Sequence, residues 1–181
     1  MKATLVTCLA AATLLIAGGR WALGSDDPEH VRKSLERATI SLSAAVEQAL
    51  AQIPDSKAVE ASLETKHDNT TFEIEVVAHG KHRIVEVDPT GGAVEKKGGE
   101  SIEENQQDAS EQVETQISRA PVTLVQAVKA ALEQEPHAKA CRVEPKKHDG
   151  RLVFSVELLA QRKLVKVLVD ATSCEIVPHG G

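Results

Sequence analysis

Aromatic residues are scarce in this chain of 181 residues, which has two Phe, one Trp and no Tyr. The sequence also lacks a His-Glu-x-x-His pair, a Gly-x-Ser-x-Gly elbow and a phosphate-binding glycine-rich loop. These absences argue against the commoner enzyme classes. We therefore expect a protein that is not an enzyme and has no catalytic residue, cofactor or resident metal.

Basic stretches are missing as well. The chain has 21 Lys and Arg residues against 27 Asp and Glu residues, which gives a net charge of −6. Neutralisation of phosphates supplies much of the affinity of proteins for nucleic acid. An acidic chain without a basic stripe is therefore not expected to bind nucleic acid.

No apolar run is long enough for a comfortable membrane span, which needs about 20 residues. Residues 1–24 instead resemble a signal peptide, with Lys2, an uncharged run over 3–19 and small residues at Ala22 and Gly24. Cleavage there removes two basic residues and no acid, so the net charge changes from −6 to −8. The alternative is an uncleaved anchor, because Arg20 and Trp21 suit a membrane interface.

The remaining chain repeats itself. Residues 40–95 align with 122–177 without a gap at a constant offset of 82, and 17 of the 56 aligned positions are identical. The identities run from Leu42/Leu124 near the start to Asp88/Asp170 near the end. This register predicts a tandem repeat.

Each repeat begins with apolar residues at helical spacing, after Ser41 or Thr123 as N-cap and before Pro54 or Pro136. Three segments with alternating apolar residues follow, separated by turn residues. We therefore predict an α+β fold of two tandem repeats, each with one helix packed on a three-stranded antiparallel β-meander. A short return strand at 93–94 is a further expectation.

The predicted domains are the signal peptide at 1–24, an N-terminal segment with a short helix at 25–39, a first domain at 40–95 and a second at 121–178. Residues 96–120 between them are rich in Glu and Gln and have few apolar residues. This composition favours an acidic solvated tether over a marginal polar helix.

The repeat resembles the PepSY domain. The resemblance lies in the pattern I/V-S/T-L-x-x-A-V-x-x-A-L-x-x-x-P, a lysine three residues later, Phe-x-Ile/Val-x-Glu-Val/Leu, and strands ending in VDPTGG or VDATSC. PepSY domains are known from the propeptides of thermolysin-like metallopeptidases and from other exported or membrane-linked proteins. The 181 residues are expected to contain no peptidase domain, and Ser173-Cys174 replaces Gly91-Gly92 in the second copy.

The resemblance implies a non-enzymatic module, exported to the periplasm or the extracellular space, that binds and modulates a secreted or envelope protein. The modulation would be inhibition, assistance or localisation, and a peptidase or another hydrolase is the implied partner. Membrane attachment is expected only if the N-terminal segment is uncleaved. The alternatives are an envelope protein that binds a metal or small ligand and a structural or chaperone-like component.

Seven histidines raise the question of a metal site, and His79 and His82 flank a predicted turn. The second repeat has Gln161 and Leu164 there, and metal sites usually need three or four ligands. Solvated turn residues are the favoured interpretation. A site built on the pair would show metal binding that is lost on substitution of both.

Two cysteines, Cys141 and Cys174, lie outside the signal segment. Cys141 aligns with Val59 at a strand position that alternation predicts to face the helix, whereas Cys174 follows the third strand. A disulfide needs Cα atoms within about 7 Å, so we expect two unpaired thiols.

The two repeats differ on the sheet face that the helix does not cover. The first is expected to present Glu73, Glu75, Glu86 and Asp88 to water. The second presents apolar residues, and we take Val153, Leu159, Leu164 and Leu168 as the candidate protein-binding face. This face is expected to dock either the first repeat or a partner protein.

Overall fold

A computed structural model describes residues 27–66, 69–79, 81–91, 94–97, 115–117 and 119–178. The predicted signal peptide lies outside the described residues. The first repeat contains helix α2 (Leu42–Gln52) and strands β1 (Ser56–Lys66), β2 (Asn69–Ala78) and β3 (Lys81–Val87). The second contains α4 (Leu124–Gln134), β5 (Lys139–His148), β6 (Arg151–Ala160) and β7 (Lys163–Asp170). Helix α1 (Pro28–Arg37) precedes both repeats, and β4 (Val94–Lys97) and β8 (Ile176–Val177) are short return strands.

This arrangement confirms the predicted α+β fold with two helix-then-meander repeats. The predicted N-caps are also present: the Ser41 hydroxyl accepts a hydrogen bond from the Ala44 amide at 3.2 Å. Thr123 forms a reciprocal capping box with Gln126. Both helices bury the same four positions, which are Leu42, Ala45, Val46 and Ala49 in α2 and Leu124, Ala127, Val128 and Ala131 in α4.

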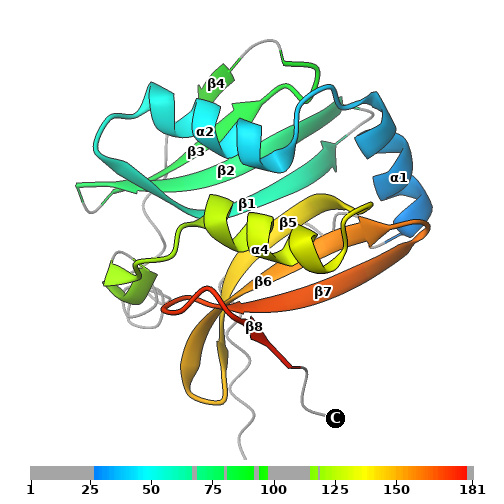
Figure 1. The fold of residues 1–181 in the computed structure, drawn as a ribbon. Coiled ribbons are helices and arrows are strands. Elements are labelled where there is room, and N and C mark those ends of the chain that lie inside the picture. The colour runs from blue at the N-terminus through cyan, green and yellow to red at the C-terminus, as the bar shows by residue number, and fades with distance from the viewer. Residues whose placement is uncertain are drawn as a thin grey trace, which may run out of the picture.

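The two meanders form one antiparallel sheet of eight strands in the order β4-β3-β2-β1-β5-β6-β7-β8. Figure 1 shows α2 and α4 side by side on one face of this sheet. The repeats meet where β1 pairs with β5, at Ala61 with Val143 and Ser62 with Arg142. Val143 is the repeat equivalent of Ala61, so the junction has an approximate local twofold axis at this pair.

A shared core lies between the two helices and the sheet. Phe72 and Phe154, which occupy equivalent positions of the two repeats, are both fully buried in it. Residues of both repeats belong to the same cluster, including Ala61 and Val143 at the junction. The tandem repeat therefore folds around one core, and each small repeat gains burial that it would lack alone.

One predicted alternation was wrong in the first strand of each repeat. A β-bulge interrupts β1 between Ala58 and Glu60 and β5 between Ala140 and Arg142. A bulge inserts one extra residue and shifts the alternation of side chains. Cys141 is that extra residue in β5, and it is buried on the face opposite α4.

The segment predicted as a tether is ordered at both ends. Lys96 and Lys97 belong to β4, and residues 115–117 are helical. The Lys57 ammonium donates hydrogen bonds to the carbonyls of Ile117, at 2.5 Å, and Ala120, at 2.8 Å, and Ile117 is buried. These contacts fasten the end of the segment to β1. Residues 98–114 lie outside the part of the chain that the structure describes.

Candidate functional site

Helix α1 lies on the sheet face opposite α2 and α4, over the start of β5 and the end of β6. Asp27 caps it by accepting a hydrogen bond from the Glu29 amide at 3.1 Å, and Pro28 occupies its first turn. Its exposed side is charged, with an ion pair between Arg32 and Glu29 at 2.6 Å. Only Ser34 and Leu35 of this helix are fully buried.

An apolar surface lies beneath α1, and we call it the junction groove. Its members are Leu63 of β1, Cys141 of β5, Leu159 of β6 and Leu164 of β7. Val31 and Leu35 of α1 pack against it. The groove therefore combines strands of both repeats and exists only because the two meanders join.

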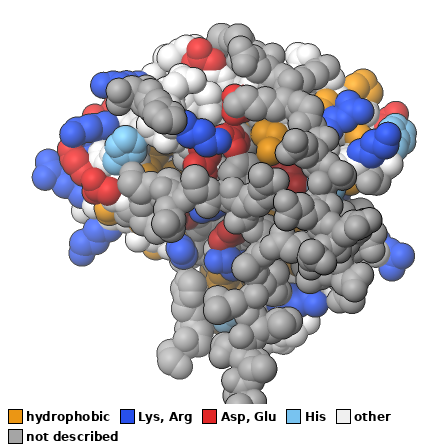
Figure 2. Space-filling view, turned by 180° about the vertical axis from the view of Figure 1, so that it is seen from behind, with side chains coloured by type: hydrophobic (Ala, Val, Ile, Leu, Met, Phe, Trp, Pro, Cys, Tyr) orange, Lys and Arg blue, Asp and Glu red, His pale blue; other side chains and the backbone are white. Residues whose placement is uncertain are grey.

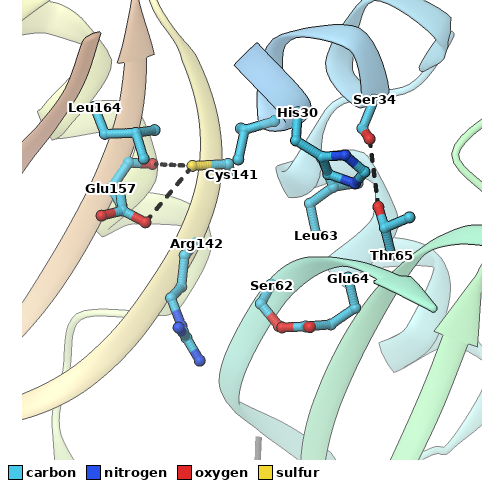
Figure 3. Close-up of a pocket in the computed structure, with 11 residues that line it drawn as sticks. His30, Ser34, Ser62, Leu63, Glu64, Thr65, Cys141, Arg142, Glu157 and Leu164 are labelled. Carbon is cyan, nitrogen blue, oxygen red and sulfur yellow. Dashed lines mark hydrogen bonds between the residues drawn. The ribbon is translucent and has the colours of Figure 1, made fainter. Parts of the chain in front are cut away.

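The packing at the groove leaves a cavity of about 50 Å³. Figure 3 shows His30 and Ser34 of α1 on one side of it and Cys141 and Glu157 on the other. The Ser34 hydroxyl oxygen lies 3.3 Å from that of Thr65, and the Cys141 thiol donates to the Glu157 carbonyl oxygen at 3.4 Å. The contact between α1 and the sheet is thus partly polar and incompletely filled.

Opposite charges meet across the junction. Arg142 donates a hydrogen bond to Glu60 at 3.3 Å, and its Nε lies 3.8 Å from a carboxylate oxygen of Glu144. Glu60 and Arg142 are repeat equivalents. The repeats therefore place an acid and a base, rather than two like charges, on either side of the local twofold axis.

Two carboxylates at the junction, Glu60 and Glu64, have raised pKa values because they are buried. Burial raises the pKa of Glu60 to about 7, with Arg142 opposing the shift and Glu144 and Glu75 adding to it. Burial also raises the pKa of Glu64, whose carboxylate accepts a hydrogen bond from Ser62 at 2.9 Å. The junction therefore holds carboxylates that gain protons more readily than exposed ones.

The four residues of the candidate protein-binding face lie on the sheet face opposite α4, in two separate pairs. Leu159 is buried and Leu164 is half-buried, and both belong to the junction groove. Val153 and Leu168 are also buried, nearer the other end of the strands. The cover over Leu159 and Leu164 is α1, a segment that the repeat pattern alone did not connect with this face.

The first repeat was predicted to expose four acidic residues on its outer sheet face, but one of them is buried. Glu73 was expected in water, but its exposed fraction is 2%. Lys66 pairs with its carboxylate, because a carboxylate at this depth needs a partner. In Figure 2, which views the molecule from this side, some acidic side chains lie near the middle and others at the edges, and many Lys and Arg side chains lie toward the periphery.

The two histidines of the hypothetical metal pair lie in different surroundings. His79 is exposed in the β2–β3 turn with φ of 52°, whereas His82 forms a hydrogen bond with Glu75. Among the described residues, no group of three or more His, Cys, Asp or Glu side chains is placed to hold a metal ion.

Both described cysteines are free thiols. Cys141 is buried, and this burial raises its pKa to about 12. Cys174 is half-buried and takes a left-handed conformation with φ of 63° in the turn after β7. No described helix is both long and apolar enough to cross a membrane.

The sequence contained two signals of this site that our prediction did not use. Val31 and Leu35 have the spacing of one helix face, and they lie in the N-terminal segment for which only a short helix was predicted. Glu60 and Arg142 occupy the same repeat position with opposite charges. Neither signal shows that β1 pairs with β5, because that pairing is determined by the tertiary structure.

The match to a known protein family supports the repeat. No curated protein matches the chain significantly. A crystal structure described as that of "a putative lipoprotein" from Clostridium difficile 630 is similar over 78% of this chain and 92% of that chain, with 15% identity and a TM-score of 0.40. The family described as PepSY, peptidase propeptide and YPEB domain, matches residues 39–97 and 121–177, which together exceed half of the chain. Two copies of the repeat, each with its helix on a meander, therefore place this chain in the PepSY family.

Proposed function

We propose that the chain is an exported, non-enzymatic protein-binding module that modulates a secreted or envelope protein by inhibition, assistance or localisation. Peptidases are the partner class to test first, because the family is named for a peptidase propeptide domain. PepSY domains are generally non-catalytic, propeptide-like modules.

The observation that carries the proposal is the fusion of two PepSY repeats into one eight-stranded sheet with an apolar groove at their junction. A continuous sheet with a single core is a rigid support, and rigid supports suit protein recognition because little ordering is required on binding. The apolar part of the groove comes mainly from the second repeat, through Cys141, Leu159 and Leu164.

The test is capture followed by a functional assay. The purified chain is immobilised, exposed at physiological salt to exported proteins of its source, and the bound proteins are identified by mass spectrometry. Each captured protein is then purified, and its activity, stability and location are measured with and without the chain. We expect a specific partner in which at least one of these properties changes.

A matched pair of variants connects capture with the proposed face. Leu164→Glu places a charge on the half-buried groove residue, whereas Gln161→Glu makes the same charge change at an exposed turn nearby. We expect Leu164→Glu to lose capture and Gln161→Glu to keep it, with melting temperatures recorded for both. Absence of any specific partner, or capture without an effect on the partner, would contradict the proposal.

A further inference from the structure

Helix α1 is held to the protein by few contacts. The Lys139 ammonium donates a hydrogen bond to the Leu35 carbonyl at 2.9 Å, and the Ser34 hydroxyl lies 3.4 Å from that of Thr70. Its apolar contribution is limited to Leu35 and the half-buried Val31. By comparison, α2 and α4 each bury four side chains in the shared core. Segments with few buried apolar contacts are those that open locally while the rest of a protein stays folded.

The groove under α1 is also incompletely filled. Leu63 and Leu164 stay half-buried beneath the helix, and the cavity of about 50 Å³ lies beside them. A helix that fitted the groove closely would leave less space there, so α1 covers the groove incompletely. Replacement of α1 by another helix therefore loses few packing contacts.

We propose that the junction groove is a docking site for an amphipathic helix, that α1 occupies it in the free protein, and that a helix of the partner displaces α1. This inference rests on the proposed function and names the surface through which the partner is bound. The chemistry of the partner helix follows from α1. The partner helix has apolar residues at positions i and i+4, which correspond to Val31 and Leu35 of α1. It has a small residue at position i+3, which corresponds to Ser34.

The groove also sets the direction of the incoming helix. Lys139 donates to a carbonyl in the last turn of α1, where backbone carbonyls lack partners within the helix. A cation near the C-terminal end of a helix is favourable for the helix dipole as well. The partner helix therefore lies in the same direction as α1, with its C-terminal end at Lys139.

Cys141 reports on the opening of the groove, because it is buried in the same apolar cluster as Leu35 of α1. Its thiol is unreactive while covered and becomes alkylatable when α1 leaves. Cys174 lies in the turn after β7, away from the groove, and serves as the internal reference. Mapping of alkylated peptides by mass spectrometry measures both rates in the full chain.

The first measurement compares variants of α1. Leu35→Ala removes the main apolar contact of the helix, so we expect the alkylation rate of Cys141 to rise by about tenfold or more. Val31→Ala is the second variant, in case the first perturbs folding, and exposed Glu36→Ala is the matched control. The Cys174 rate should change little in any of them. If Cys141 is alkylated in all of these proteins only on global unfolding, together with Cys174, α1 does not leave the groove of the folded protein and the proposal is wrong.

The second measurement supplies a helix in trans. The probe is a synthetic peptide of residues 27–37 with a lactam between Glu29 and Lys33, two exposed positions one turn apart. It should slow the alkylation of Cys141 in the Leu35→Ala protein several-fold, in a saturable manner. The same lactam peptide with Leu35→Ala should leave the alkylation rate of Cys141 unchanged. The lactam peptide with Glu36→Ala should slow it as much as the wild-type peptide does.

Absence of protection by the saturating wild-type peptide would overturn the docking site, as would equal protection by the Leu35→Ala peptide. These outcomes do not depend on a natural partner, so they are separable from a failure of the proposed function. Protection by the peptide without any captured partner would retain the groove and reject the modulating role.

Discussion

Glu60 should make the protein less stable as the pH rises through neutrality. Its side chain is 13% exposed, and burial raises its pKa from 4.5 to about 7 despite the nearby Arg142. Because the pKa is higher in the folded than in the unfolded state, the stabilising contribution is fully present below the unfolded value. It is lost as the pH rises through the folded value.

The size of the effect follows from the shift. One pKa unit corresponds to about 1.4 kcal/mol, so a shift from 4.5 to about 7 lowers the free energy of unfolding by up to about 3 kcal/mol between pH 4.5 and pH 8. Glu60→Gln removes the titration but keeps an oxygen that accepts from Arg142. The variant should therefore be close to the wild type at pH 4.5 and more stable than it at pH 8.

The assay is urea unfolding followed by circular dichroism at a series of pH values, because the chain has too few aromatic residues for a reliable fluorescence signal. Exposed Glu47→Gln on α2 is the matched control and should follow the wild type. Parallel loss of stability by the wild type and Glu60→Gln between pH 5 and pH 8 would refute the assignment of this titration to Glu60.

Three further predictions concern stability and use the same unfolding assay. Phe72→Ala and Phe154→Ala should each cost about 3–5 kcal/mol, since each removes a fully buried ring; a cost below 1 kcal/mol for either would contradict its place in the shared core. Thr123→Ala should cost about 1 kcal/mol by removing the capping box, and an unchanged stability would show that the cap is not needed. Lys57→Met should cost about 1–3 kcal/mol by leaving the Ile117 and Ala120 carbonyls without this donor, and limited proteolysis should then cut near 117 more readily.

The repeat itself was readable from the sequence because local patterns encode it. The helical spacing of Leu42, Ala45 and Val46, the caps at Ser41 and Thr123, and the alternation around Phe72 each depend on neighbours in the chain. The candidate protein-binding face could be predicted from the sequence only in part. Strand alternation placed Leu159 and Leu164 on the face opposite α4, but it did not show that α1 covers them.

Errors in the prediction came from contacts between strands, which simple alternation does not take into account. The bulges in β1 and β5 moved Cys141 to the opposite face, and the ion pair with Lys66 allowed Glu73 to be buried. Both outcomes depend on contacts across the sheet rather than on the order of residues in one strand.

The sequence by itself determined two helix-then-meander units of one family, because periodicity, caps and turns act over a few residues. Only the tertiary structure decided that β1 pairs with β5, that Glu60 meets Arg142, and that α1 lies over a groove built by both repeats. The physical reason is that each repeat leaves a strand edge and an apolar patch unsatisfied. Which segment pairs with that edge and which packs on that patch depends on the packing of the whole chain.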